Sequence, residues 1–179
     1  APASCRLGWR AVRQVKLEAL APDRLQALIG PVRTERFQAA AAAARELLAG
    51  RRVLNVNSTA SGGGVAELLQ TLLTYSLGVG VNVEWAVIDG NPPFFEITKR
   101  LHNHLYGTAG DGGPLGDAAR GPYEATLAEN ADGLRSLINP SDIVVLHDPQ
   151  TAGLAAVARE AGAVVVWRCH VGRDTANAY

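Results

Sequence analysis

The 179-residue chain has few cysteines, no net charge and no long apolar run, and each of these shortages excludes a class of protein. Its two cysteines, Cys5 and Cys169, are far apart and lack the spacing of a zinc site or a disulfide framework, so we expect a reduced, cytoplasmic protein. Positive and negative side chains balance at 17 each, which leaves no basic surface for nucleic acid. No apolar run approaches the roughly 20 residues that a membrane span needs.

Methionine is absent altogether, even at position 1, so we interpret the chain as a processed or trimmed product. What is present is typical of a folded domain, because 47% of the residues are hydrophobic and only 19% are charged. A chain of this length suits a single domain with a sizeable core.

Short β-branched runs alternate with helical segments, a pattern that predicts an α/β fold with a Rossmann-like parallel sheet and helices on both faces. The predicted strands are 51–57, 81–89, 142–148 and 163–169, and the predicted helices are 65–78, 92–107, 123–138 and 151–162. Residues 1–49 are expected to form a helical extension, with helices at 21–30 and 34–50, the second capped by Thr34. Residues 50–179 form the sheet domain, in which the glycine-rich segment 108–121 is predicted to be a loop or mobile lid.

Polar residues lie at the end of each predicted strand or directly after it. They are Asn57, Asp89, His147 with Asp148, and Cys169 with His170. Because ligands of parallel sheets bind beyond the carboxyl ends of the strands, we expect the functional site at this edge.

A glycine loop, Ser61-Gly62-Gly63-Gly64, joins the first predicted strand of the sheet domain to its helix. Adjacent glycines let the backbone approach a ligand, and the free N–H groups of the helix start favour a phosphate or diphosphate. The lysine of a P-loop is missing. Gly62-x-Gly64 with Asp89 at the next strand end keeps a dinucleotide-binding oxidoreductase open as an alternative, although Glu67 stands where that motif has its third glycine.

Two further motifs lie at strand ends. His147-Asp148-Pro149-Gln150 can orient sugar hydroxyls, unless Asp148 or Pro149 only begins the next helix. His170, just past the last predicted strand, either faces the cleft or is a satisfied structural histidine.

Lys99, His102 and Asn103 recur at helical spacing and form either a solvated face or one wall of a polar pocket. His102 and His104 are two residues apart and cannot share a helical face, so we expect no metal site.

Four segments together resemble the amino-terminal half of trehalose glucosyltransferring synthases, which are retaining glycosyltransferases of family 4. The segments are NVNSTASGGGVAELL, VEWAVIDGNPPFFEITKRLHNHLYG, DIVVLHDPQTAGL and VVWRCHVGRD. The resemblance runs from about residue 50 to the end. It implies the amino-terminal, acceptor-side domain of a GT-B fold, with the carboxy-terminal nucleotide-binding domain absent.

The resemblance also implies a reaction. The family transfers glucose from a nucleoside diphosphate glucose, UDP- or ADP-glucose, to free glucose and forms α,α-trehalose; the related trehalose phosphorylases are an alternative. It implies no tightly bound cofactor, with Mg²⁺ accompanying the nucleotide sugar. With half of the cleft missing, we expect negligible turnover from this chain alone and a homodimer through the bared surface.

Site residues follow from the same resemblance, position by position. Gly62, Gly63 and Gly64 would face the donor diphosphate and the transferred glucose, and Glu67 would contact the sugar or hold the loop. His170 and Asp148 would be catalytic, with His170 lining the reaction centre. The residues expected to contact acceptor hydroxyls are Asp148, Gln150, Lys99 and Asn103.

Overall fold

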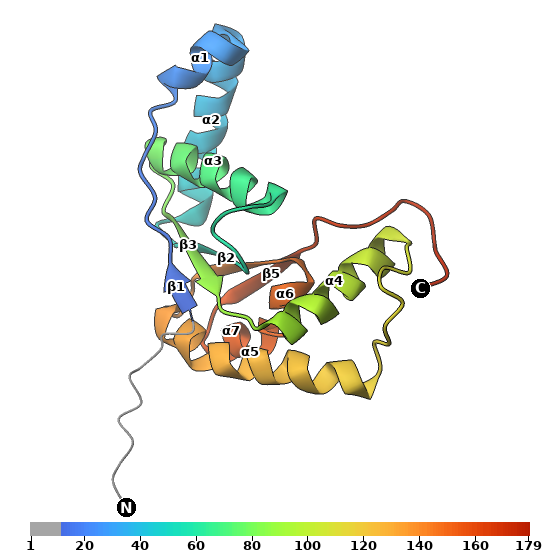
Figure 1. Ribbon diagram of the computed structural model, residues 1–179. Coiled ribbons are helices and arrows are strands. Elements are labelled where there is room, and N and C mark those ends of the chain that lie inside the picture. Colours follow the sequence, from blue (N-terminus) through green and yellow to red (C-terminus); the bar gives the residue numbers. More distant parts are fainter. Residues whose placement is uncertain (1–11) are drawn as a thin grey trace, which may run out of the picture.

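The computed structural model describes residues 12–179, which form a five-stranded sheet with helices on both faces (Figure 1). The strands are β1 (Val12–Gln14), β2 (Val53–Asn57), β3 (Val83–Ile88), β4 (Ile143–His147) and β5 (Val164–Arg168). They lie in the order β1-β3-β2-β4-β5, with β2 to β5 parallel and β1 antiparallel to β3 at one edge. The predicted Rossmann-like α/β fold is confirmed.

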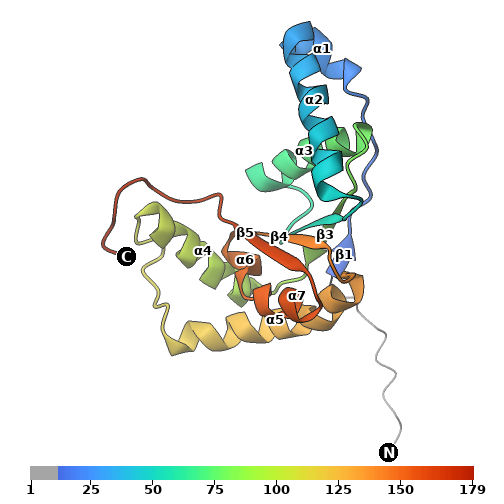
Figure 2. The ribbon, with the colours of Figure 1, turned by 180° about the vertical axis from the view of Figure 1, so that it is seen from behind.

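Helices connect the strands and cover the sheet unequally. They are α1 (Asp23–Ile29), α2 (Pro31–Leu48), α3 (Gly64–Gly78), α4 (Pro92–Tyr106), α5 (Asp117–Leu137), α6 (Asp148–Ala152) and α7 (Ala155–Glu160). α3 packs on one face, whereas α4, α5 and α7 pack on the other. α1 and α2 contact each other and project away from the sheet (Figure 2).

Each face of the sheet has its own hydrophobic core, because successive side chains of a strand point to opposite faces. Leu54 and Val56 of β2 are fully buried in the cluster that also contains Leu134 of α5. Trp85 of β3 is buried in the second cluster with Leu69 of α3. β2 and β3 therefore lie between two helical layers.

The structure corrects the predicted start of α2. The helix begins at Pro31, whose fixed φ suits the first turn, and not at Thr34. The Thr34 hydroxyl donates a hydrogen bond back to the Gly30 carbonyl oxygen at 2.9 Å, so Thr34 is an interior helical residue and not the cap.

Two other predicted boundaries are wrong. The segment 108–121 is not a loop throughout, because α5 begins at Asp117 and carries Pro122 inside it. Proline lacks one N–H and therefore removes one helical hydrogen bond, which α5 tolerates near its start. The helix predicted at 151–162 is two short helices, and the first of them starts at Asp148, directly after β4.

The segment 1–49 holds a strand that the sequence analysis does not predict. In β1, Val12 pairs with Ile88 of β3, so this part of the chain joins the sheet. A three-residue strand is too short to display a hydrophobic period. Residues 1–11, which include Cys5, lie outside the described residues.

An ionic cluster ties the amino ends of the central strands together. The Arg52 guanidinium donates to Asp142 before β4 and, at 2.9 Å, to Glu84 of β3. It also donates to the Leu137 carbonyl oxygen at the end of α5. Burial lowers the pKa of Arg52, but hydrogen bonds to Asp142 and Glu84 outweigh it, so the pKa lies above its ordinary value.

The opposite, carboxyl ends of the strands contain the topological switch point. From β2 the chain moves to β3 on one side, and then crosses to β4 on the other side of β2. Ligands of open α/β sheets bind in the crevice at such a point. Here it lies between Asn57, which ends β2, and His147, which ends β4.

Candidate functional site at the carboxyl edge of the sheet

The glycine loop after β2 leaves the start of α3 open. Gly62 and Gly63 have φ values of +72° and +144°, in regions that residues other than glycine rarely adopt. α3 begins at Gly64, and no side chain of residues 12–179 caps its first turn. Its first N–H groups are therefore available to an anion, as the predicted diphosphate site requires.

A hollow of about 340 Å³ lies beside this loop. Ser61, Gly62 and Glu67 are among its lining residues, together with Ala60, Ala66, Gln70 and Thr71. Buried Asn57 anchors the loop: its Nδ2 donates to the Thr59 carbonyl oxygen at 2.7 Å, and its Oδ1 accepts from Trp85 Nε1 at 2.7 Å. Asn57 therefore fixes the shape of the loop, and the exposed Glu67 side chain is the charged group that lines the hollow.

His147 and His170 are in direct contact at the ends of β4 and β5. The Nδ1 atom of His147 lies 2.8 Å from Nε2 of His170, and the two rings meet edge to edge, with centroids 5.1 Å apart and planes inclined by 27°. On its other side, Nε2 of His147 lies 3.1 Å from Oδ1 of Asn55 on β2. His147 is 1% exposed, whereas His170 is only partly buried.

Asp148 holds the backbone of His170. Its Oδ1 accepts a hydrogen bond from the His170 N–H at 2.7 Å, and its own carbonyl oxygen accepts from Trp167 Nε1 at 2.9 Å. Asp148 has a φ of +62°, which is uncommon for a residue with a side chain and recurs at functional sites. The structure thus brings together the two predicted catalytic residues, Asp148 and His170.

Both histidines favour their neutral forms. Burial, followed by electrostatic repulsion from the protonated form of His170 and from Arg168, lowers the pKa of His147 to about 4. Burial also lowers the pKa of His170; the Asp148 carboxylate opposes this shift and Arg168 adds to it.

The depressed pKa of His147 makes folding pH-dependent. Between about 4 and the ordinary value of 6.5 the unfolded chain binds a proton that the folded chain excludes, so stability rises with pH in this window. Lowering the pH from 7 to 5 should cost about 2 kcal/mol through this residue. Urea unfolding at both pH values measures the loss, and it should be smaller in His147→Phe. An equal pH dependence in the variant would contradict the assignment.

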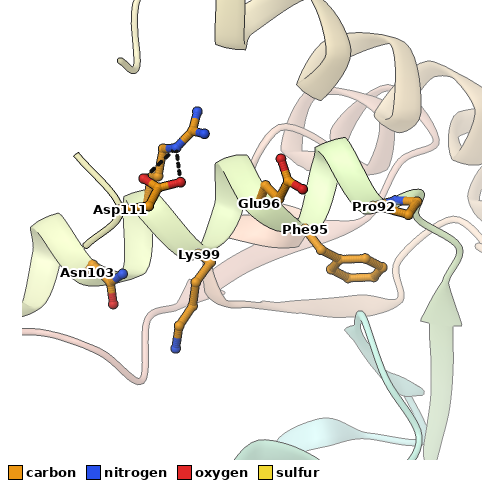
Figure 3. Close-up of a pocket in the computed structure, with 7 residues that line it drawn as sticks. Pro92, Phe95, Glu96, Lys99, Asn103 and Asp111 are labelled. Atoms are coloured by element: carbon orange, nitrogen blue, oxygen red, sulfur yellow. Dashed lines mark hydrogen bonds and ion pairs between the residues drawn. The ribbon is translucent and has the colours of Figure 1, made fainter. Parts of the chain in front are cut away.

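A second pocket, of about 410 Å³, runs along α4. Its lining residues are Pro92, Phe95, Glu96, Lys99, Arg100, Asn103 and Asp111. Lys99 and Phe95 extend from the same side of the helix, whereas Glu96 and Asp111 lie on the other side (Figure 3). Arg100 Nε donates to both carboxylate oxygens of Asp111, at 2.7 and 2.8 Å, which fastens the loop after α4 to the helix. The predicted acceptor residues Lys99 and Asn103 therefore line the same pocket, whereas His102, which shares their helical spacing, is not among its lining residues.

The remaining predicted positions are placed as follows. Gln150 is half-buried on α6. The side chain of Asp89 is exposed and accepts from the N–H of Gly90, while its backbone exchanges two hydrogen bonds with Asn130 of α5. Cys169 is a free cysteine whose Sγ–H donates to the Val171 carbonyl oxygen. Asp89 and Cys169 thus have structural contacts.

The sequence analysis missed Asn55. Asn55 is a buried polar residue in the middle of an apolar strand, and this was the available signal. Burial, followed by the positive charge of Lys99, lowers the pKa of His102 on α4, and the Asp148 carboxylate opposes this shift.

Within residues 12–179, none of the helices is long and apolar enough to cross a bilayer. The same residues contain no cluster of three His, Cys, Asp or Glu side chains that could hold a metal ion.

The parallel sheet defines the class of the protein, a Rossmann-like α/β domain, and its glycine loop and paired histidines lie at the switch point, where ligands of such sheets bind. Residues 55–179 match the family model for the N-terminal domain of trehalose synthase. The chain belongs to this family.

Individual relatives agree. The chain is 40% identical over 132 residues to trehalose synthase of Rubrobacter xylanophilus, and the aligned residues cover 73% of this chain and 31% of the relative. It is 36% identical over 132 residues to trehalose synthase of Pyrococcus horikoshii, covering 74% and 31%. Trehalose phosphorylase of Pleurotus pulmonarius is 31% identical over 122 residues, covering 64% and 16%. The chain thus spans about a third of the length of the trehalose synthases that it matches.

Proposed function

We propose that this chain forms the acceptor-side half of the cleft of a retaining glucosyltransferase, which joins glucose from UDP- or ADP-glucose to free glucose and yields α,α-trehalose. Membership of the trehalose synthase family carries the proposal. The open start of α3 beside the glycine loop supports it, because this is where a diphosphate would be held.

In this proposal the protein contributes positioning and electrostatics. The glycine loop receives the donor diphosphate, and His170 lies at the reaction centre with its backbone fixed by Asp148. Lys99 and Asn103 bind acceptor hydroxyls from the pocket along α4. The leaving phosphate takes the proton of the acceptor hydroxyl as the glucosyl bond forms on the same face, so no protein nucleophile is needed.

Trehalose phosphorylase chemistry is the second candidate, and the match to that enzyme from Pleurotus pulmonarius favours it. It would use the same half-cleft with inorganic phosphate in place of the nucleoside diphosphate. The oxidoreductase alternative has weaker support: the Asp89 carboxylate is exposed at the end of β3, but Glu67 stands in place of the third glycine and the family match points to trehalose enzymes.

The proposal extends to cofactors and partners. Mg²⁺ would arrive with the nucleotide sugar; the described residues do not themselves supply a cluster of three ligands for it, so no step here depends on a metal. A homodimer would cover the edge strand β5, which leaves Val164, Val166 and Trp167 about half exposed. A cytoplasmic location is part of the same proposal.

The deciding experiment compares the 179-residue chain with the full-length product of its gene. Both are incubated with glucose and either UDP-glucose or ADP-glucose, and trehalose is measured. We expect trehalose from the full-length protein and negligible turnover from the chain, because the diphosphate would be held from one side only.

The other outcomes are equally informative. Release of glucose 1-phosphate from trehalose and phosphate, without synthesis from nucleotide sugar, would favour the phosphorylase. Robust synthesis by the chain alone would contradict the half-cleft. Inactivity of the full-length protein in both assays would overturn the proposed function.

A further inference from the structure

His147 contacts His170 on one side and Asn55, in the central strand β2, on the other. Asn55 Oδ1 lies 3.1 Å from Nε2 of His147, and a carbonyl oxygen can only accept, so this nitrogen carries the proton. In a neutral imidazole the other nitrogen is then an acceptor. Nδ1 of His147 therefore accepts the hydrogen bond that Nε2–H of His170 donates at 2.8 Å.

His147 remains neutral at the pH of most assays. Its ring is 1% exposed, and its charged neighbours are Arg168 on β5, His170 beyond it and Asp148 on α6. Burial and the positive neighbours lower its pKa to about 4. His147 thus keeps its acceptor nitrogen facing His170 whether or not His170 is protonated.

Asn55 gives an independent reason to assign a role to this chain of contacts. Its Nδ2 is buried without a hydrogen-bond partner among the described residues, an arrangement that folding alone disfavours. A valine at this position would suit the strand better, since the neighbouring positions of β2 are apolar. The amide is explained if its carbonyl is needed to fix the proton of His147.

We propose that His147 is a positioning residue, which, anchored by Asn55, holds the ring of His170 so that its Nδ1 is presented to the substrate as a hydrogen-bond acceptor for a sugar hydroxyl. The inference rests on the proposed function for its substrate. The dipeptide His147-Asp148 then holds His170 twice, by its ring and by its backbone N–H.

The first test is the tautomer of His170 in the 179-residue chain, read from long-range ¹H–¹⁵N correlation spectra of the histidine rings. We expect His170 as the Nε2–H tautomer with a bare Nδ1, and His147 still mostly neutral at pH 5. A His170 that carries its proton on Nδ1, or that exchanges between both tautomers as free imidazole does, would overturn the proposal.

Variants of His147 separate its two contacts. His147→Phe keeps an aromatic ring but neither nitrogen, and we expect mixed tautomers of His170 and a lower pKa of His170, since its imidazolium loses an acceptor. His147→Asn keeps an acceptor near the Nδ1 position and should preserve the tautomer. His104→Phe is the matched control on α4 and should leave His170 unchanged. An unchanged His170 in His147→Phe contradicts the proposal; if that variant does not fold, the wild-type spectrum decides.

Activity gives a second readout in the full-length enzyme. In His147→Phe we expect kcat to fall about tenfold or more, the order found when a partner that orients a metal-bound histidine is lost. KM for glucose should change less than roughly threefold, and the acidic limb of the pH profile should shift. A wild-type kcat and pH profile in this variant would refute the positioning role. Absence of trehalose chemistry in the wild-type enzyme would instead refute the proposed function, while the spectra still decide the role of His147.

Discussion

Replacing Arg52 with methionine is expected to lower the free energy of unfolding by roughly 3–5 kcal/mol, because the buried Asp142 carboxylate loses its charged partner and keeps only the hydrogen bond from the Asn139 N–H. The Asp142 side chain is 6% exposed and that of Arg52 12%, so water cannot take over the lost hydrogen bonds. For a chain of this size the corresponding fall in Tm is about 10 °C. Urea and thermal unfolding of the 179-residue chain measure both quantities.

An exposed ion pair supplies the control. Arg120 and Glu124 lie one turn apart on α5, with side chains 70% and 58% exposed, and such pairs contribute little. Arg120→Met should therefore change stability by less than about 0.5 kcal/mol. Adding Asp142→Asn to Arg52→Met should recover part of the loss. Equal effects of the two arginine substitutions would show that the cluster at the amino ends of the strands is not what stabilises the sheet.

Gly63→Ala is expected to have the next largest effect. Its φ of +144° and ψ of +151° lie in a region restricted almost entirely to glycine, so alanine should cost roughly 1–3 kcal/mol or force the loop into another shape. A reshaped loop would also remove the backbone from the proposed diphosphate site. We therefore expect KM for the nucleotide sugar to rise about tenfold or more in the full-length enzyme, as measured in the trehalose assay.

Gly64→Ala is the matched control for stability. A Cβ at either position would meet open space, so packing does not distinguish the two substitutions. Gly64, however, has no positive φ and is the first residue of α3, where alanine is favourable by up to about 1 kcal/mol. Gly64→Ala should leave the chain as stable or more so. A comparable loss in both variants would mean that backbone strain at Gly63 is not the cause.

Much of the fold could be predicted because its signals are local. The apolar runs 51–57, 81–89, 142–148 and 163–169 contain β2, β3, β4 and β5. For the central strands the reason is burial on both faces, which requires continuous hydrophobic runs. The polar residues at the end of each run mark the edge of the sheet that holds the candidate site, because ligands of parallel sheets bind beyond the carboxyl ends of the strands. Pro122 misled the prediction, because a proline ordinarily signals the end of a helix and here lies inside α5.

The candidate site was only partly predictable. His170 and Asp148 were identified, but their direct contact was not, because it depends on the turn that gives Asp148 its positive φ. Asn55 was missed because its meaning depends on a partner 92 positions away. Strand neighbours in a parallel sheet are set by crossover connections, and no local pattern records them.

The sequence by itself determined the α/β class, the glycine loop and the row of polar strand ends, since each depends on residues adjacent in the chain. Only the tertiary structure decided that β4 lies between β2 and β5. This order places His147 within reach of both Asn55 and His170, and burial at that position keeps its imidazole neutral. The chemistry of the site therefore depends on contacts between distant residues, which packing of the sheet creates.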